Sequence, residues 1–556
     1  MGKITIYQIF SRLFGNGIDN NKSNGSIHDN GCGKMNGVTP EALKSIKNMG
    51  ITHIWFTGLI AHASKTNYSQ HGIPPSHHAT VKGIAGSPYA IRDYYDIDPD
   101  LAESIPQRMR EFESLVERVH NAGLKLIIDF VPNHVAREYR SINKPEKICD
   151  LGADDNTTRR FDPKNNFYYI VGEALSGPIE WGDYHEMPAK ATGNDKFTSC
   201  PNNYDWYETV KINYGVDYDN NCAEHFNPVP DTWNKMVDIL YFWASKGVDG
   251  FRCDMAEMVP VQFWDYSISL IKKKYPRLIF IAEIYNPGSF SRYVSTGRFD
   301  FIYDKVSLYD TLRAVTCGNE SATALTRCWQ RTGHVGNKLL HFMENHDEQR
   351  IASAFFADSA EIGRPSMIVS ACIDTCPVMV YSGQELGERG MDKEGFSGYD
   401  GRTSIFDYWS VDTLRRWYNN GQFNESLLTE TEKKLRSFYS TLLRICTTEK
   451  AISRGKFFDL MYVNPYSSEF NPHKHFAFIR CFGKELILVI ANFDNKSTSV
   501  SIFIPEHAFQ YLSIKIKGKR KAIDLISGLE SEVNLWPDFI LTTHIHANNG
   551  VILKIY

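Results

Sequence analysis

The first 450 residues alternate short apolar runs with longer amphipathic stretches. Continuous apolar runs bounded by turn residues are typical of strands buried on both faces, and longer stretches of helical periodicity are typical of surface helices. Such runs predict strands at residues 4–10, 53–60, 124–131, 250–255, 278–284, 299–304, 339–345 and 377–383. Helical stretches lie between or beside them at 40–49, 107–121, 231–245, 261–275 and 359–374. Eight strands with helical connections predict an α/β fold, a (β/α)8 TIM barrel.

Two parts of the chain depart from this alternation. Residues 135–228 are rich in Asn, Asp, Gly, Tyr and Pro and are too long for one connection, so we expect an inserted domain B after the third strand. From residue 451 onward, short alternating segments separated by turn residues predict a C-terminal antiparallel β-sandwich, domain C, at 451–556. Its predicted strands lie at 457–463, 475–482, 485–493, 499–505, 512–517, 521–526 and 551–556. The catalytic barrel, domain A, then comprises residues 1–134 and 229–450.

Composition narrows the classes of protein that fit. The 61 basic and 65 acidic side chains give a formal charge of −4, which argues against a nucleic-acid-binding protein. No apolar run reaches the roughly 18 residues of a membrane span. The eleven cysteines form no CxxC pair, which favours reduced thiols in a cytoplasmic protein. The first residues show no signal peptide, so we expect a cytoplasmic location unless a leader was removed.

The aromatic content is high, with 33 Phe, 29 Tyr and 10 Trp. Such side chains build a large core or serve as stacking platforms for sugars or bases, and composition does not separate these roles.

Candidate chemistry lies at the predicted strand ends, because barrel enzymes place their sites at the carboxyl ends of strands. One such residue alone has a simpler explanation: an Asp is usually a cap, and a His is usually a hydrogen-bonded structural residue. Here carboxylates recur at four strand ends, with two histidines close by, and this convergence indicates a site. The residues are Asp129, Asp254, Glu283 and Asp347, with His134 and His346.

Two of these carboxylates fit a retaining glycosidase. Asp254 and Glu283 are one strand–helix unit apart, which places them at neighbouring strand ends. Retaining glycosidases need two carboxyl groups about 5–5.5 Å apart. Arg252 shares a strand face with Asp254 and favours its ionised form, as a nucleophile requires. The apolar run before Glu283 suits a carboxyl that stays protonated as an acid.

These segments resemble the α-amylase family, glycoside hydrolase family 13. Residues 129–134, 250–254, 281–283 and 342–347 are similar to its four conserved regions, in the same order, and 50–60, 87–95 and 380–388 match more weakly. The resemblance implies Asp254 as nucleophile, Glu283 as acid/base and Asp347 as the group that binds sugar hydroxyls. It also implies substrate-binding roles for Tyr89, His134, Arg252 and His346, with Tyr89 stacking on the sugar. The aromatic stretch at 204–207 is a further candidate sugar platform.

The sequence departs from the family at several positions. Glu257 and Met258 stand where a basic residue and a histidine often bind the acceptor sugar. Lys211 stands where many members have an aspartate, as in neopullulanases and cyclomaltodextrinases, and this weakens the case for the usual domain B calcium ion. Ala90 follows the platform tyrosine, where many exo-acting α-glucosidases have an aspartate.

An N-terminal loop presents side-chain oxygens at alternating positions. Asp19, Asn21 and Asp29 could contribute to a structural Ca²⁺ site, since calcium takes six to eight oxygen ligands. The alternative is a solvated Asn/Gly loop. No cofactor is expected for the chemistry itself.

The predicted function is a retaining α-glucoside hydrolase that cleaves α-1,4-glucosidic bonds in maltooligosaccharides or related α-glucans by double displacement. The partner is an α-glucan substrate, with no nucleic acid and no membrane. An α-glucanotransferase with the same triad is the alternative. A non-catalytic family member acting as a binding subunit is disfavoured, because all three carboxylates are present.

Overall fold

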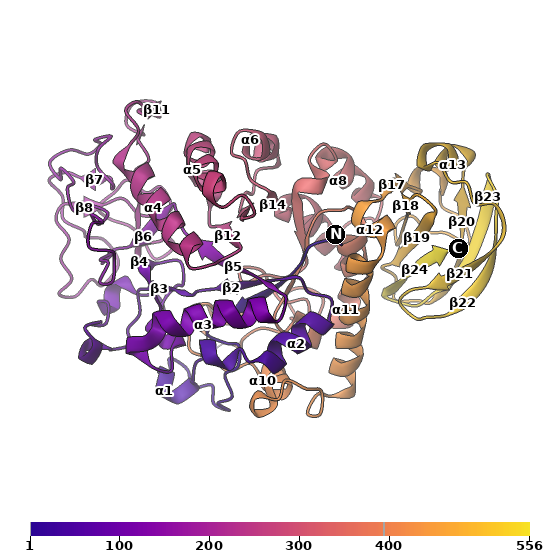
Figure 1. The fold of residues 1–556 in the computed structure, drawn as a ribbon, viewed down its shortest axis with the longest axis horizontal. Coiled ribbons are helices and arrows are strands. Elements are labelled where there is room, and N and C mark those ends of the chain that lie inside the picture. Colours follow the sequence, from indigo (N-terminus) through magenta and orange to yellow (C-terminus); the bar gives the residue numbers. More distant parts are fainter. Residues whose placement is uncertain (1, 393–394) are drawn as a thin grey trace.

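The computed structural model describes residues 2–392 and 395–556, and its centre is a closed barrel of eight parallel strands (Figure 1). In barrel order the strands are β1 (Thr5–Phe10), β2 (His53–Thr57), β5 (Lys125–Phe130), β12 (Gly250–Cys253), β13 (Ile279–Ala282), β14 (Phe301–Tyr303), β15 (Leu339–Phe342) and β16 (Val378–Tyr381). β16 returns to pair with β1 and closes the sheet. The predicted barrel and its eight strands are confirmed.

The barrel interior is filled by side chains from alternate positions of these strands. Because successive strand residues point to opposite faces, one set forms a separate buried cluster inside the barrel: Ile6, Trp55, Ile127, Ile281, Tyr303, Leu340, Phe342 and Met379. Tyr309, from the helical turn after β14, completes this cluster. The other set packs outward against the helices. This arrangement explains why the strands have continuous apolar runs instead of alternating ones.

Helices surround the barrel. The principal ones are α2 (Pro40–Asn48), α3 (Arg108–Asn121), α4 (Asp231–Ser245), α5 (Val261–Lys274), α7 (Asp310–Thr316), α8 (Ala324–Thr332), α9 (Arg364–Cys372) and α11 (Glu430–Thr448). α11 was not predicted, although its start carries a reciprocal capping box between Thr429 and Glu432.

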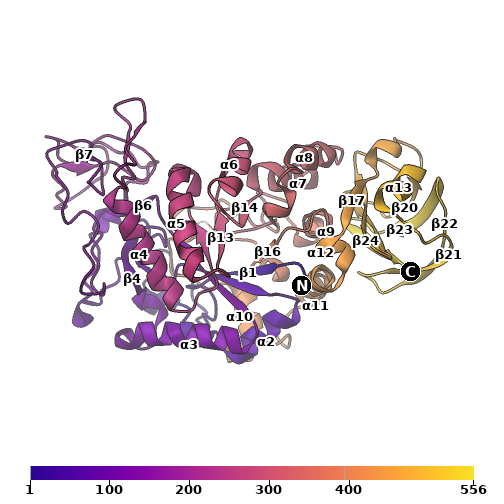
Figure 2. The ribbon, with the colours of Figure 1, turned by 45° about the horizontal axis from the view of Figure 1, so that its top comes forward.

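Residues 135–228 contain only short strands. β6 (His134–Ala136) follows the third barrel strand and pairs with β9 (Thr209–Lys211), while β7 (Tyr169–Ile170) pairs with β8 (Ala189–Lys190) and β10 (Val216–Asp217) with β11 (Ala223–Glu224). Figures 1 and 2 show most of this segment at the end of the molecule opposite the C-terminal strands. The β6–β9 pair therefore brings residues near 209 to the carboxyl end of the barrel, beside His134.

The C-terminal region forms two antiparallel sheets. One has the order β17 (Lys456–Asp459), β18 (His475–Phe482), β19 (Glu485–Asn492), β24 (Asn549–Ile555), β21 (Gly518–Asp524) and β22 (Glu530–Leu535). The other pairs β20 (Thr498–Ile504) with β23 (Phe539–Ile545). The predicted strand at 512–517 is wrong: α13 (Glu506–Leu512) ends there, and Ser513 adopts a left-handed conformation. The alternation of Ile514 and Ile516 with lysines gave a strand pattern, but the segment has no partner strand.

The described part of the chain contains no helix with the length and apolar character needed to cross a bilayer. The eleven cysteines are free thiols. The domain boundaries after residues 134, 228 and 450 stay predictions.

Candidate active site

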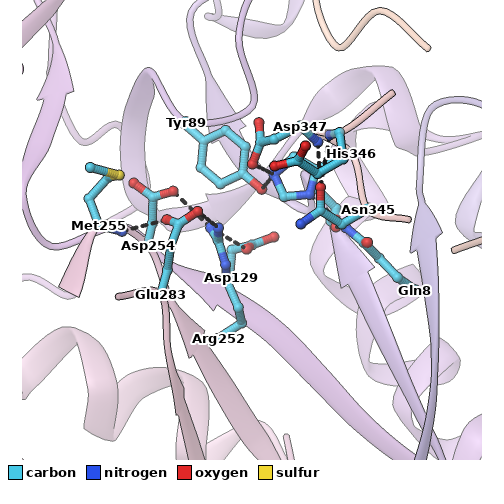
Figure 3. Close-up of polar contacts among 12 residues, drawn as sticks. Gln8, Tyr89, Asp129, Arg252, Asp254, Met255, Glu283, Asn345, His346 and Asp347 are labelled. Atoms are coloured by element: carbon cyan, nitrogen blue, oxygen red, sulfur yellow. Dashed lines mark hydrogen bonds and ion pairs between the residues drawn. The ribbon is translucent and has the colours of Figure 1, made fainter. Parts of the chain in front are cut away.

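The predicted catalytic residues meet at the carboxyl end of the barrel. β12 and β13 pair in parallel, with Cys253 opposite Ala282. The residues that follow, Asp254 and Glu283, are therefore neighbours at adjacent strand ends (Figure 3). Asp347 approaches from the loop after β15. The sequence-based expectation of adjacent strand ends agrees with this register.

One arginine links both of the proposed catalytic carboxylates. The fully buried guanidinium of Arg252 places Nη1 2.7 Å from Asp254 Oδ1 and Nη2 2.7 Å from Glu283 Oε1. Nη1 also lies 3.4 Å from Asp129 Oδ1, and Nε donates to the hydroxyl of Tyr303 at 3.2 Å. Because the guanidinium is planar and rigid, these contacts fix the two carboxylates relative to each other.

Asp254 keeps one oxygen available. Arg252 holds Oδ1, whereas the buried Oδ2 has no hydrogen-bond partner among the described residues. Burial raises the pKa of Asp254 well above its usual value; Arg252 opposes this effect, and Glu283 and Asp129 add to it. The sequence argument expected Arg252 to keep Asp254 ionised. The tertiary structure adds desolvation and two further carboxyls, so the net direction of the pKa shift is upward.

Asp129 lies beneath the site as a supporting residue. The indole Nε1 of Trp55 donates to its Oδ2 at 3.2 Å, and burial raises the pKa of Asp129 to about 6. Three buried carboxyls thus surround a single guanidinium, which favours retention of a proton in the site.

Glu283 accepts hydrogen bonds at both oxygens. The hydroxyl of Tyr285 donates to Oε1 at 2.8 Å, and the backbone N–H of Met255 donates to Oε2 at 2.7 Å. Met255 has φ 43° and ψ 41°, a left-handed conformation that is costly for a residue with a side chain. In this conformation the backbone N–H of Met255 points at Glu283 Oε2. Tyr285 was not among the predicted site residues.

Asp347 is presented by a tight turn. The side-chain oxygen of Asn345 accepts the N–H groups of Asp347 at 2.9 Å and of Glu348 at 3.0 Å. Asp347 Oδ2 lies 3.0 Å from His346 Nε2. Burial tends to raise the pKa of Asp347, but His346, with smaller contributions from Arg252 and Arg402, lowers it to about 2. Asp347 is therefore held as a carboxylate.

His346 connects Asp347 to Tyr89 and to the barrel interior. Its Nε2 hydrogen-bonds with the Tyr89 hydroxyl, and the two rings stack with centroids 5.2 Å apart. Its Nδ1 lies 2.8 Å from Gln8 Nε2. Gln8 was missed by the sequence analysis, although a polar residue inside the apolar run at 4–10 was a usable signal. Its contact orients the imidazole (Figure 3).

His134 lies on the side of the site formed by the inserted segment. Burial, reinforced by the positive charge of Lys211, lowers the pKa of His134 to about 3, so the ring is neutral. Its centroid lies 5.3 Å from that of Trp206, which belongs to the predicted aromatic stretch at 204–207. Tyr204 of the same stretch is 96% exposed, whereas Trp206 lines the cleft.

These residues border one cleft of about 320 Å³. Its lining comprises Lys82, Ser87, Tyr89, His134, Trp206, Glu208, Thr209, Asp254, Met255, Glu283, Tyr285, Asp347, Ile405 and Phe406. Five of the seven predicted catalytic and sugar-binding residues line it: Asp254, Glu283, Asp347, Tyr89 and His134. The other two contact lining residues, His346 through Tyr89 and Asp347, and Arg252 through Asp254 and Glu283. The positions of these residues agree with the sequence-based expectation; their roles stay proposals.

Glu257, one of the positions at which the sequence departs from the family, holds a loop beside the site. Its Oε2 accepts the backbone N–H of Tyr285 at 3.0 Å and that of Asn286 at 3.2 Å. Glu257 therefore braces the loop after β13, from which the Tyr285 hydroxyl reaches Glu283.

The proposed calcium ligands are used by protein partners. Asp19 pairs with Arg415 at 2.7 Å, and Asn21 exchanges two hydrogen bonds with the backbone of Ser410. Asp29 caps α1 (Ile27–Asn30) through Ser26. With these partners, the three side chains do not fit a shared Ca²⁺ ion, and among the described residues no His, Cys, Asp and Glu side chains cluster as a metal site would require.

A parallel barrel with two carboxylates bridged at neighbouring strand ends, and a third carboxylate opposite, is an arrangement that fits a retaining glycoside hydrolase. The chain belongs to the alpha-amylase family, since the family's sequence model for the alpha amylase catalytic domain matches residues 8–433. The predicted family, the fold and the class of enzyme are confirmed.

The relatives of this chain are distant. Alpha-amylase 2 of Dictyoglomus thermophilum is 24% identical over 500 residues, covering 88% of this chain and 69% of that protein. Neopullulanase 2 of Thermoactinomyces vulgaris is 22% identical, covering 69% of this chain and 56% of that protein. The crystal structure of the alpha-amylase from H. orenii has a TM-score of 0.64 at 17% identity and covers 100% of both chains. The last similarity supports the fold alone.

Proposed function

We propose that this protein is a retaining α-glucoside hydrolase that cleaves α-1,4-glucosidic bonds in maltooligosaccharides or related α-glucans. The observation that carries the proposal is the bridge of Arg252 between Asp254 and Glu283, with Asp254 Oδ2 left free. The bridge sets a nucleophile and an acid side by side, as double displacement requires.

In the first step, Glu283 gives a proton to the glycosidic oxygen while Asp254 Oδ2 attacks the anomeric carbon. The bond from that carbon to the leaving oxygen breaks, and a glycosyl ester of Asp254 forms. The step requires the retained proton to be on Glu283 and Asp254 to be ionised. Arg252, which contacts both groups, can follow the shift of charge between them without moving.

In the second step, Glu283 accepts a proton from water as the water oxygen bonds to the anomeric carbon. The ester bond breaks and the Asp254 carboxylate is restored. Two inversions at one carbon leave the α configuration unchanged. Every group in both steps belongs to this chain or to its substrate.

The remaining cleft residues hold the sugar ring that reacts. Asp347, kept negative by His346, accepts hydroxyl hydrogens and stabilises the positive charge that develops on the ring. His134 is neutral and can donate or accept a hydrogen bond. Tyr89 offers its ring as a stacking face, in line with its placement over Arg252, 5.3 Å from the guanidinium.

The test is product analysis with maltoheptaose, followed by NMR of the first product formed. We expect only shorter saccharides, first released as the α anomer, and we expect Glu283→Gln and Asp254→Asn to release none. Asp219→Asn, which alters an exposed ion pair with Arg160, is the matched control and should behave as wild type.

Two results would change the proposal. Products longer than maltoheptaose would replace hydrolysis by glucanosyl transfer. No release of reducing sugar by wild type from maltoheptaose, pullulan, cyclodextrin or isomaltose would reject an enzyme and favour a binding subunit.

We further propose that the protein works in the cytoplasm on oligosaccharides. Eleven free thiols suit a reducing compartment, where disulfides do not persist. Fractionation of the source cells, with activity followed in the cytosolic and exported fractions, tests this location.

A further inference from the structure

Two opposite charges face the cleft, and the proposed chemistry does not use them. Lys82 Nζ lies 2.9 Å from Glu208 Oε2, and the two side chains are only 13% and 6% exposed. Both residues line the cleft together with the proposed catalytic carboxylates. Withdrawing two charges from water is costly even when they are paired, so a pair at this position needs an explanation.

The Lys82–Glu208 pair has hydrogen-bonding groups that its protein contacts do not fully use. Glu208 Oε2 is buried and, among the described residues, accepts no hydrogen bond of good geometry. The Lys82 ammonium has three donors. Within the described part of the chain, its other contacts are the carbonyl of Asp205, at 3.3 Å, and the ring of Tyr207, 5.0 Å away. An acceptor and donors are thus available side by side in the cleft wall.

The chemistry indicates at which end of the cleft the pair lies. Glu283 protonates the leaving oxygen, so the leaving part of the substrate occupies the side of Glu283 and Tyr285. The ring that reacts is held by Tyr89 and His134. The pair belongs to the elements that carry these two residues, and from this connection we infer that it lies on the non-reducing side of the reacting ring.

The local connections support this placement. Lys82 and Tyr89 belong to one loop, with Lys82 first in the chain. The segment at 405–406 contacts this loop, because the Phe406 carbonyl accepts a hydrogen bond from the Ala85 N–H at 3.1 Å. Glu208 directly precedes β9, whose Lys211 is the register partner of His134. Trp206, two residues before Glu208, contacts the His134 ring.

A non-reducing end differs from the interior of an α-1,4 chain at one oxygen. The terminal sugar carries a free 4-hydroxyl, which both donates and accepts a hydrogen bond. In an internal sugar the same oxygen is part of a glycosidic linkage and has no hydrogen to donate. When a carboxylate and an ammonium lie side by side, a hydroxyl can donate to the carboxylate and accept from the ammonium. A linkage oxygen has no hydrogen to donate, so the carboxylate facing it stays unpaired.

Ala90 replaces the aspartate that many exo-acting α-glucosidases have, so recognition of a chain end would need other residues here. We propose that Lys82 and Glu208 bind the terminal hydroxyls of the non-reducing end, so that the protein removes sugars from chain ends. This inference rests on the proposed function and defines which part of the α-glucan the same cleft recognises. It assigns end specificity to an ion pair formed between the loop before Tyr89 and the inserted segment.

The experiment compares maltopentaose with a maltopentaoside whose terminal 4- and 6-hydroxyls are blocked by an ethylidene group. We expect wild type to consume the free-ended substrate at least about 100-fold faster, as measured by initial rates of substrate loss. Lys82→Met and Glu208→Gln should narrow this ratio at least about tenfold, chiefly through lower kcat/KM on the free-ended substrate. Asp219→Asn, in the exposed ion pair of the same inserted segment, should leave the ratio unchanged.

Equal consumption of both substrates by wild type would overturn the inference while leaving the proposed hydrolase intact. A wild-type ratio retained in both folded variants, as judged by circular dichroism, would overturn the assignment to Lys82 and Glu208. If one variant does not fold, the inference is tested by the wild-type rate ratio and by the ratio of the other variant. Consumption of neither substrate by wild type would reject the proposed function itself.

Discussion

The side-chain ammonium of Lys211 lies 2.7 Å from a carboxylate oxygen of Asp195 and is 2% exposed. It also donates to the side-chain oxygen of Asn133 and to the carbonyl of Met258, at 3.2 Å. One buried cation thus joins the end of the third barrel strand, the inserted segment and the loop after β12. Carboxylate, amide and carbonyl oxygens of this kind also bind metal ions. Here the ammonium of Lys211 supplies the positive charge among them.

Replacing Lys211 by methionine should destabilise the fold. The variant keeps most of the side-chain volume but leaves Asp195 and Asn133 without their buried donor, and we expect a loss of about 2–4 kcal/mol in the free energy of unfolding. Urea denaturation measures this loss. Lys164→Met, at an exposed position of the same segment, is the control and should lie within about 0.5 kcal/mol of wild type. An unchanged denaturation midpoint for Lys211→Met would show that the ammonium does not hold these elements together.

Chelation should leave the protein unaffected. Lys211 supplies the positive charge at one candidate metal position, and Asp19, Asn21 and Asp29 are occupied by protein contacts. We therefore expect less than about 1 °C change in Tm with excess EDTA, measured by differential scanning calorimetry, since a ligand that binds only the folded state shifts Tm when it is removed. A drop of several degrees that added Ca²⁺ restores would reveal a metal site.

Asp254→Asn should separate activity from stability. The change deletes the nucleophile, so kcat should fall by about 10⁴-fold. The pKa of Asp254 is raised in the folded state, mainly by burial. The folded protein therefore binds this proton more tightly than the unfolded chain, and the carboxyl costs stability as pH rises and it ionises. The uncharged variant should have a Tm at neutral pH equal to or above that of wild type; a clearly lower Tm would contradict the pKa direction.

Asp347 should contribute stability with the opposite pH dependence. Its pKa is lowered from 3.8 to about 2, which means that its stabilising effect is complete above the unfolded value and is lost as pH falls through about 2. Because its side chain is 39% exposed, we expect only about 1 kcal/mol at pH 6 relative to Asp347→Asn. The difference between the two unfolding free energies should close between pH 4 and 2. A difference independent of pH in this range would rule out the electrostatic origin.

Tyr285→Phe tests how Glu283 is positioned. The Tyr285 hydroxyl donates to Glu283 Oε1 at 2.8 Å and so fixes the orientation of this carboxyl. Without it, the Glu283 carboxyl loses one of its two orienting contacts, and kcat should fall by about tenfold while KM changes little. An unchanged kcat would show that the Tyr285 hydroxyl does not position Glu283. Tyr266→Phe, which removes a hydroxyl contact with Asn234 on the helical layer, is the control.

The barrel and the catalytic carboxylates could be predicted because their signals are local. A strand buried on both faces must be apolar along its length, and a barrel enzyme must display its polar residues where such strands end. Asp254 and Glu283 could therefore be placed side by side from spacing alone. The strand at 512–517 was predicted wrongly for the same reason, because local alternation says nothing about whether a partner strand exists.

Other site residues depended on contacts between distant segments. Gln8 reaches His346 across 338 positions of sequence, and Trp206 and Glu208 enter the cleft only because β9 pairs with β6. No periodicity encodes such approaches.

The barrel, the order of its strands and the identity of the carboxylates at their ends were predictable from local patterns, because each follows from which nearby side chains must be buried. The upward pKa shift of Asp254, the cation at Lys211 and the charged pair at Lys82 and Glu208 arise from tertiary contacts that no local pattern predicts. These properties depend on how far a group is removed from water and on which charges surround it. Both are set by chain segments that meet only when the whole molecule folds.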